Sequence, residues 1–152
     1  MDLKIKKEIQ KRLKKGQSIS FEAETALQGG PLVHVFINNA NVGEVYTYNS
    51  EKKCHENISA GSPKDNELGD AIKEWVHNEY FDFMRCNDEL LREYYECSFK
   101  LDGNDILLEI NIHEEDEYGE TVYDDDEDPV FDSYTVTIEE IELSIRAIED
   151  ED

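Results

Sequence analysis

The chain has 152 residues, of which 38 are acidic and 15 basic, so its formal net charge is −23. Hydrophobic residues make up 38% of the chain, which is enough for one core in a chain of this length, and we treat residues 1–152 as a single domain. A body this acidic repels phosphate at long range, which argues against direct binding of free nucleic acid.

The chain shows no sign of a membrane segment or a disulfide framework. No apolar run approaches the roughly 20 residues that a membrane-spanning helix needs, and residues 1–15 lack the apolar stretch of a signal peptide. The three cysteines, Cys54, Cys86 and Cys97, are odd in number and few. We therefore expect a cytoplasmic protein with free thiols and no membrane contact.

The N-terminal segment differs from the rest in charge. Residues 1–15 hold seven basic and two acidic residues, which leaves a net charge of −28 on the remainder. Leu3, Ile5, Ile9 and Leu13 form a narrow apolar stripe, and Gly16 is a helix-ending residue. We predict a basic helix over residues 1–16 that packs its stripe on the core while its lysines screen the acidic body; the alternative is a helix that binds a partner or a membrane surface.

Three strands are expected after this helix. Alternation of apolar and polar residues predicts a strand over 19–27, and residues 32–37 are an apolar, β-branched run. The asparagine-rich residues 38–41 predict a turn into a third strand over 42–48, which completes an antiparallel meander. The polar residues 49–61 are expected to form a loop.

The main helix is predicted to begin at Ser62, with Pro63 in its first turn. Apolar residues at helical spacing follow, from Leu68 to Trp75, and further aromatic residues extend this surface to Met84. Asn87 and Asp88 are expected to end the helix before a short turn over residues 89–92.

A hairpin is the clearest local prediction. The turn residues 102–105 separate two alternating runs, and pairing Leu101 with Ile106 places every apolar side chain on one face. The other face is then polar, because it carries Glu96, Ser98, Lys100, Glu109, Asn111 and His113.

The C-terminal part contains an acidic block and an ambiguous element. Ten of the residues 114–128 are acidic, which predicts a self-repelling, mobile acidic loop. A strand through Tyr134 and Val136 follows. We favour a bulged strand over residues 138–148 because of the isoleucine content; the alternative is a helix opened by a capping box at Thr137 and Glu140. Residues 149–152 form a solvated tail.

These elements together predict an α+β fold. The antiparallel sheet, a meander plus hairpins of about five to seven strands, packs against one main helix, and a short basic helix precedes it.

Metal and cofactor sites are not indicated. No C-x-x-C or H-E-x-x-H motif occurs. Asp124, Asp126 and Asp128 occupy the first, third and fifth positions of a calcium loop, but Pro129 and Thr135 replace the glycine and glutamate that such a loop requires. We predict neither a metal nor a cofactor.

Catalytic motifs are also lacking, so we predict that the protein is not an enzyme. There is no nucleophile elbow, phosphate-binding loop or dinucleotide fingerprint. Cys97 alternates with core residues and is interpreted as a small buried hydrophobe. His77 follows Glu74 by three residues, which is typical of a surface pair on a helix.

The charge itself exceeds the magnitude of about 2–8 that solubility requires of a small domain. Regularly spaced carboxylates on a folded surface resemble a row of phosphates, so the first hypothesis is an acidic inhibitor of a basic, nucleic-acid-binding protein such as a nuclease, in the manner of immunity proteins and anti-defence DNA mimics. Tyrosines among the acids suit the grip of lysine- and arginine-rich partners. The partner-binding residues we predict are Glu114, Glu115, Asp116, Glu117, Asp124, Asp125, Asp126, Glu127 and Asp128.

Two other hypotheses remain open. A small-molecule-binding or enzymatic domain would use a pocket between helix and sheet near Trp75, with His77, Cys86 or His113 as its polar group. A structural or assembly subunit would dock the basic helix of residues 1–15 on the acidic body of a neighbouring copy.

Overall fold

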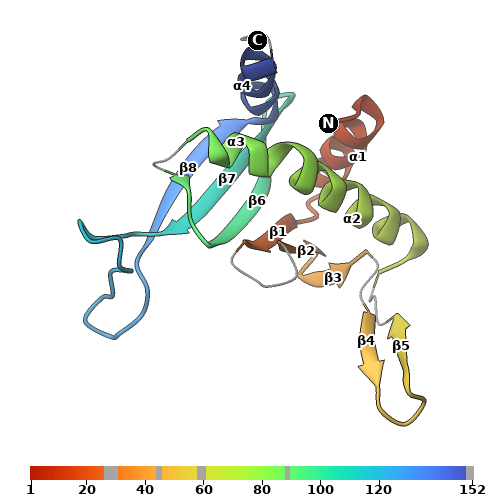
Figure 1. Cartoon of the computed structure of the whole chain (residues 1–152). Coiled ribbons are helices and arrows are strands. Elements are labelled where there is room, and N and C mark those ends of the chain that lie inside the picture. Colours follow the sequence, from red (N-terminus) through yellow and green to blue (C-terminus); the bar gives the residue numbers. More distant parts are fainter. Residues whose placement is uncertain (26–30, 44–45, 58–60, 88–89, 150–152) are drawn as a thin grey trace.

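The computed structural model describes residues 1–25, 31–43, 46–57, 61–87 and 90–149 (Figure 1). Its main sheet has six antiparallel strands in the order β3-β2-β1-β6-β7-β8. These strands are β1 (Ile19–Glu24), β2 (Leu32–Ile37), β3 (Ala40–Val42), β6 (Tyr94–Asp102), β7 (Asp105–His113) and β8 (Phe131–Thr137). A separate hairpin pairs β4 (Tyr46–Asn49) with β5 (Cys54–Asn57). The α+β fold is as predicted.

The helices gather on one face of the main sheet. They are α1 (Leu3–Lys14), α2 (Pro63–Trp75), the π-helical stretch η1 (Val76–Tyr80), α3 (Phe81–Arg85) and α4 (Ile138–Glu149). Phe21 lies opposite Cys97, and Cys97 lies opposite Ile110, so three neighbouring strands contribute one buried row. Tyr80 packs edge to face on Phe21, which joins this row to the helical layer.

The other face of the main sheet is polar. Glu22, Glu96 and Asn111 occupy successive strands in register, and all three are half-buried. No helix within the described residues lies against this face. The alternation predicted for the hairpin strands is therefore confirmed, and the sheet buries one side only.

Helix α1 docks on the core along its apolar stripe, as predicted. Ile9 is completely buried, and Ile5 and Leu13 pack against the core with part of their surface exposed. The helix begins at the cap residue Asp2, whose carboxylate accepts from the Lys4 N–H at 2.7 Å. Leu3 was predicted to belong to the stripe and does not, because it lies in the first turn with 65% of its surface exposed.

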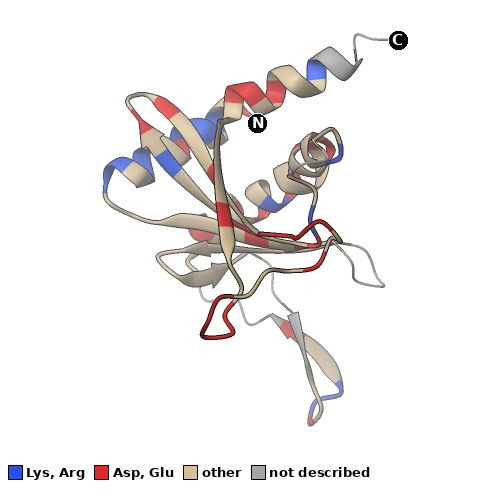
Figure 2. Cartoon of the chain, turned by 90° about the vertical axis from the view of Figure 1, so that its left-hand side faces the viewer, with Lys and Arg blue, Asp and Glu red and all other residues tan. Residues whose placement is uncertain are grey.

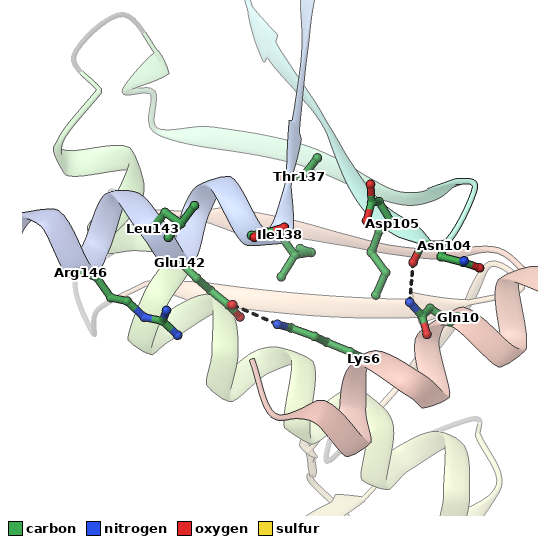
Figure 3. A pocket seen from close by; sticks show the side chains of 11 residues that line it. Lys6, Gln10, Asn104, Asp105, Thr137, Ile138, Glu142, Leu143 and Arg146 are labelled. Carbon is green, nitrogen blue, oxygen red and sulfur yellow. Dashed lines mark hydrogen bonds and ion pairs between the residues drawn. The ribbon is translucent and has the colours of Figure 1, made fainter.

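Polar contacts fix α1 in place and neutralise part of its charge. Lys6 donates to Glu142 of α4 at 2.9 Å, and the Gln10 amide donates to the Asn104 carbonyl at 2.6 Å (Figure 3). Arg12 is almost buried and pairs with Glu8 at 2.9 Å and with Asp65 in the first turn of α2. The basic helix thus screens acidic groups of its own chain.

The main helix also begins where predicted. Ser62 accepts from the Asp65 N–H at 3.2 Å, and Pro63 is the first helical residue. Trp75 ends α2, and the chain continues without interruption through η1 into α3, which ends at Arg85. The aromatic residues after Trp75 therefore extend one apolar face, and the predicted break near Asn87 is confirmed.

The predicted strand over residues 138–148 is wrong, because these residues belong to helix α4. Thr137 and Glu140 form the capping box: the Glu140 N–H donates to Thr137 Oγ1 at 3.0 Å and the Thr137 N–H donates to Glu140 Oε2 at 3.1 Å. Ile138 and Ile141 are buried at helical spacing. Reciprocal capping and this spacing outweigh the β propensity of the isoleucines.

Part of the predicted meander is also wrong. Its third strand is limited to residues 40–42, and Tyr46–Asn49 forms the first strand of the separate hairpin. Residues 54–57, which were assigned to a loop, form the second strand of that hairpin. Parts of several predicted segments lie outside the described residues, namely 26–27, 44–45, 58–60, 88–89 and 150–152. Glu149, which was predicted to begin the tail, is the last residue of α4.

Both predicted turns are present, but the first is shorter than predicted, because Ala40 and Asn41 already belong to β3. Asn38 and Asn39 have positive φ of 51° and 67°, as a type I′ turn requires. Gly103 has φ of 63° between the paired residues Asp102 and Asp105. Among the described residues, no helix combines the length and apolar character that crossing a bilayer requires.

The contact between Arg12 and Asp65 predicts a pH-dependent stability. The hydrogen bond from Arg12 lowers the pKa of Asp65 below its ordinary value of 3.8, against the opposing effect of burial. The ionised carboxylate therefore stabilises the fold above that pH and loses this effect as the pH falls through and below it. For Asp65→Asn we expect a loss of about 2 kcal/mol at pH 7, between the values for exposed and buried pairs, as measured by urea unfolding.

The same measurement at pH 3 should show a smaller difference between the variant and the original protein. Glu67→Gln, at an exposed position of the same helix, is the matched control and should change little at either pH. A loss for Asp65→Asn that is equal at pH 7 and pH 3 would contradict the assigned role of the carboxylate.

Candidate functional site

The acidic segment, residues 114–128, connects β7 to β8 and forms two turns of the same design. Asp116 Oδ1 accepts from the N–H groups of Tyr118 and Glu120 at 2.9 and 3.0 Å. Eight residues later, Asp124 Oδ1 accepts from the N–H groups of Asp126 and Asp128 at 2.9 and 3.0 Å. Each aspartate thus holds its own turn, an interaction typical of Asx turns.

Backbone hydrogen bonds join the two turns into one unit. Val122 donates to the Glu114 carbonyl at 2.8 Å, Val130 to the Val122 carbonyl at 2.9 Å, and Glu114 to the Val130 carbonyl at 2.8 Å. These three residues, spaced by eight, close a ring of hydrogen bonds beneath the turns. The segment is therefore more regular than its charge repulsion alone suggests.

Arg92 anchors the acidic segment to the sheet. Its Nε donates to the His113 carbonyl at 2.9 Å and pairs with Glu115 Oε1 at 3.1 Å. The Arg92 N–H also donates to the Tyr95 hydroxyl at 2.6 Å, so the arginine is tied to the inner face as well. Among the predicted partner-binding residues, Glu115 is thereby engaged in a contact within the chain.

The other predicted carboxylates differ in their surroundings. Asp116 and Asp124 are engaged in the turns described above. No hydrogen bond or ion pair to another described residue is made by the side chains of Glu114, Glu117, Asp125, Asp126, Glu127 and Asp128. Figure 2 shows the acidic turns as separate regions, apart from the basic residues of α1. The nine predicted residues thus belong to one segment and face solvent at more than one place.

The uncovered sheet face adds carboxylates that the sequence analysis did not assign to the site. Glu22 on β1 lies directly opposite Glu96 on β6, and Glu24 lies opposite Tyr94. Like charges directly opposite each other destabilise a sheet. Tyr94 donates its hydroxyl to Glu96 Oε1 at 2.9 Å. Burial, this hydrogen bond and the charges of Glu22 and Glu24 raise the pKa of Tyr94 well above its ordinary range.

Three aromatic rings end this face beside the acidic segment. The rings of Tyr94 and His113 have centroids 5.8 Å apart at an interplanar angle of 30°. His113 and Phe131 meet edge to face at 4.7 Å. An open hollow of about 620 Å³ adjoins them, lined among others by Thr25, Tyr94, His113 and Glu115.

Tyr134 lies opposite the buried Ile110 and therefore on the inward face of the sheet. It nevertheless keeps 38% of its surface exposed, because β8 is the edge strand.

The side chains considered for catalysis are not brought together. Cys97 is buried and within 3.3 Å of the Tyr80 hydroxyl, and burial raises the pKa of its thiol to about 12. His77 is exposed on η1 beside the ring of Phe81. His113 lies on the uncovered side of the sheet, whereas η1 packs on the covered side, so the two histidines do not share a site.

The interface between helices and sheet is filled near Trp75. Trp75, Tyr80 and Phe83 are buried there, and the Trp75 ring lies 6.1 Å from Phe99 between ring centroids. A surface hollow of about 580 Å³ touches Trp75 from the side of α1, and none of His77, Cys86 and His113 lines it. The location proposed for a pocket between helix and sheet is thus occupied by core side chains.

In the part of the chain that the structure describes, no group of three or more histidine, cysteine or acidic side chains is arranged to hold a metal ion. The Asp124 carboxylate, the first ligand of the calcium-loop comparison, accepts backbone hydrogen bonds instead.

Comparison of the chain with models of protein families, with curated proteins and with solved structures gave no match. The function must therefore be argued from the residues of this chain.

The three thiols should differ sharply in reactivity. Cys54 and Cys86 are exposed, whereas Cys97 is buried with its pKa raised to about 12. Because the thiolate is the reactive form, we expect an aromatic disulfide reagent at pH 8 to modify two thiols in the folded protein and the third only in denaturant. Cys97→Ala should remove the slow thiol alone. Rapid modification of all three in the folded protein would contradict the assigned burial.

Introducing a glycine in one acidic turn and removing the glycine of the other should change stability in opposite directions. Gly119 and Glu127 occupy equivalent positions with positive φ of 78° and 64°. At such a φ, a non-glycine residue lowers the stability of the fold by about 1–2 kcal/mol. Part of this loss is offset, because a non-glycine residue has less conformational entropy to lose when the chain folds. We expect Glu127→Gly to stabilise the fold by about 0.5–1 kcal/mol and Gly119→Ala to destabilise it similarly, as measured by urea unfolding. Stabilisation by Gly119→Ala would show that the turns are not equivalent.

Proposed function

We propose that this protein is a non-enzymatic, acidic inhibitor that binds a basic, nucleic-acid-binding protein in the cytoplasm. Its carboxylates occupy the partner's groove in place of nucleic-acid phosphates. Carboxylates on alternate residues of a strand repeat every ~6.8 Å, and a rigid anionic surface gains fast, electrostatically steered association with a basic groove.

One observation carries this proposal: the uncovered face of the sheet holds four carboxylates on three adjacent strands and leads directly into the acidic segment. These carboxylates belong to Glu22, Glu24, Glu96 and Glu109. Their backbone is part of the sheet, so the charges keep fixed spacings. A partner that recognises evenly spaced phosphates can meet such a surface without first ordering it, which favours affinity.

The cost of holding these charges supports a role in recognition. Glu22 faces Glu96 directly, and Glu127 takes a backbone conformation that favours glycine. Both features reduce stability, and strained or self-repelling groups gather at functional sites. A surface that served solubility alone would not need carboxylates at these two places.

The first experiment identifies the partner. The purified protein is immobilised, exposed to bacterial lysate at low salt and eluted with a salt gradient. We expect elution of a nucleic-acid-binding protein whose retention duplex DNA competes away and whose DNA binding this protein inhibits. Elution of proteins that neither bind nucleic acid nor lose activity in the presence of this protein would contradict the proposal.

Charge reversal in the acidic segment tests the site. Four of the six predicted side chains that make no hydrogen bond or ion pair to another described residue are changed to lysine, at Glu117, Asp125, Asp126 and Asp128. This variant should lower the association rate with that partner at least about tenfold, since steering depends on local charge. Stopped-flow measurement at two salt concentrations gives the rate. Stability should change little, because these side chains hold no turn.

A matched variant separates position from total charge. It carries the same four reversals at exposed acidic residues elsewhere, namely Glu51, Glu67, Glu74 and Asp102. We expect its association rate to exceed that of the first variant severalfold. Equal losses in the two variants would show that net charge, and not the acidic segment, drives association.

A further inference from the structure

The end of the uncovered sheet face next to the acidic segment combines rings with carboxylates. The Tyr94 ring is held in place at its hydroxyl by the hydrogen bond to Glu96, and on one side by the His113 ring. Glu24 lies opposite Tyr94 across the strand pair, and Glu22 lies two residues earlier on the same strand, opposite Glu96. Aromatic faces and carboxylates both attract a cation.

The positive charge already present at this place is satisfied. Arg92 lines the same hollow, but it pairs with Glu115 and donates to the His113 carbonyl. The carboxylates of Glu22 and Glu24, by contrast, have no ion pair among the described residues. A cation from outside would therefore meet unpaired negative charge on the sheet and would relieve the repulsion between Glu22 and Glu96.

We propose that this surface, formed by Tyr94, His113, Glu22, Glu24 and Glu96, docks an arginine side chain of a protein partner. The guanidinium plane stacks on the Tyr94 and His113 rings, and its N–H groups donate to the neighbouring carboxylates. This inference rests on the proposed function, because it names the chemical group by which a basic partner is held.

Arginine fits this surface better than lysine does. A planar guanidinium covers an aromatic ring and still presents five N–H donors in its plane, toward carboxylates at the edge of the ring. A lysine ammonium is a compact charge that is more strongly hydrated, so it gains less from the ring. Stacking adds about two- to fivefold to affinity at an exposed site.

Three peptides of identical length test the proposal with the intact protein. They alternate glycine with arginine, with lysine or with citrulline, which keeps the shape of arginine without its charge. Nuclear magnetic resonance titration follows the ring protons of Tyr94 and His113. We expect the arginine peptide to bind at least about twofold more tightly than the lysine peptide and to shift both rings, and the citrulline peptide to shift neither.

Two tyrosine variants locate the contact. Tyr94→Leu removes the ring and should lower the affinity for the arginine peptide about two- to fivefold, whereas Tyr94→Phe keeps the ring and should retain it. Tyr118→Leu, at an exposed tyrosine of the acidic segment, is the matched control and should bind as the original protein does. The amide spectrum of each variant checks its fold.

The inference is overturned if arginine and lysine peptides bind equally, or if their shifts fall on the acidic segment and leave the two rings unchanged. This comparison uses the original protein, so it does not depend on whether any variant folds. It is also distinct from failure of the proposed function, which the partner capture and charge-reversal experiments decide without any peptide. If the arginine peptide binds at Tyr94 but no nucleic-acid-binding partner is captured, the docking surface is supported and the inhibitor function is contradicted.

Discussion

The pairing of β1 with β6 is the constraint on which the rest of this structure depends. It pairs residues that are 70 to 78 positions apart in the chain, and so unites the N-terminal strands and the C-terminal hairpin in one sheet. On one side, the pairing places Phe21 beside Cys97 and closes the core under the helices. On the other side, it sets Glu22 against Glu96. The same register therefore creates both the stable face and the repelling one.

Ion pairs neutralise part of the acidic excess around helix α1, but not over the whole surface. The N-terminal amino group and Lys6 both meet Glu142, while Arg12 meets Glu8 and Asp65. These contacts connect α1 to α4 and α2, so the basic helix works as a brace at the junction of the helices. Lys6 and Arg12 form these ion pairs with residues of the helices, and not with the carboxylates of the open face. The molecule thus has a braced, partly neutralised side and an open face on which the carboxylates of Glu22, Glu24, Glu96 and Glu109 outnumber the one lysine of its described strands, Lys100.

Local signals account for what could be predicted. The turns at Asn38 and Gly103, the helix start at Ser62 and the hairpin register all depend on neighbouring residues, and all are confirmed. The helix α4 was missed because β-branched residues were given more weight than the capping pair of Thr137 and Glu140. The two acidic turns repeat after eight residues, as the spacing of Asp116 and Asp124 shows. The sequence analysis treated the segment only as a run of charge and did not use this spacing. The position of Glu22 opposite Glu96 could not be predicted from the sequence, because no local pattern indicates which distant strands pair.

Because the pairing of distant strands was not predictable, the sequence analysis limited the candidate site to the acidic segment and left out the neighbouring sheet face. Its carboxylates stand on turns that their own aspartates hold, and Arg92 ties those turns to the last row of the sheet. That row carries Tyr94 and His113, so the densest negative charge and the aromatic surface meet at one corner. Long-range attraction depends on the sum of the charges, whereas selection among cations depends on rings and fixed distances. In the proposed function, these two requirements of recognition, fast approach and choice of contact, would be met by different residues of neighbouring surfaces.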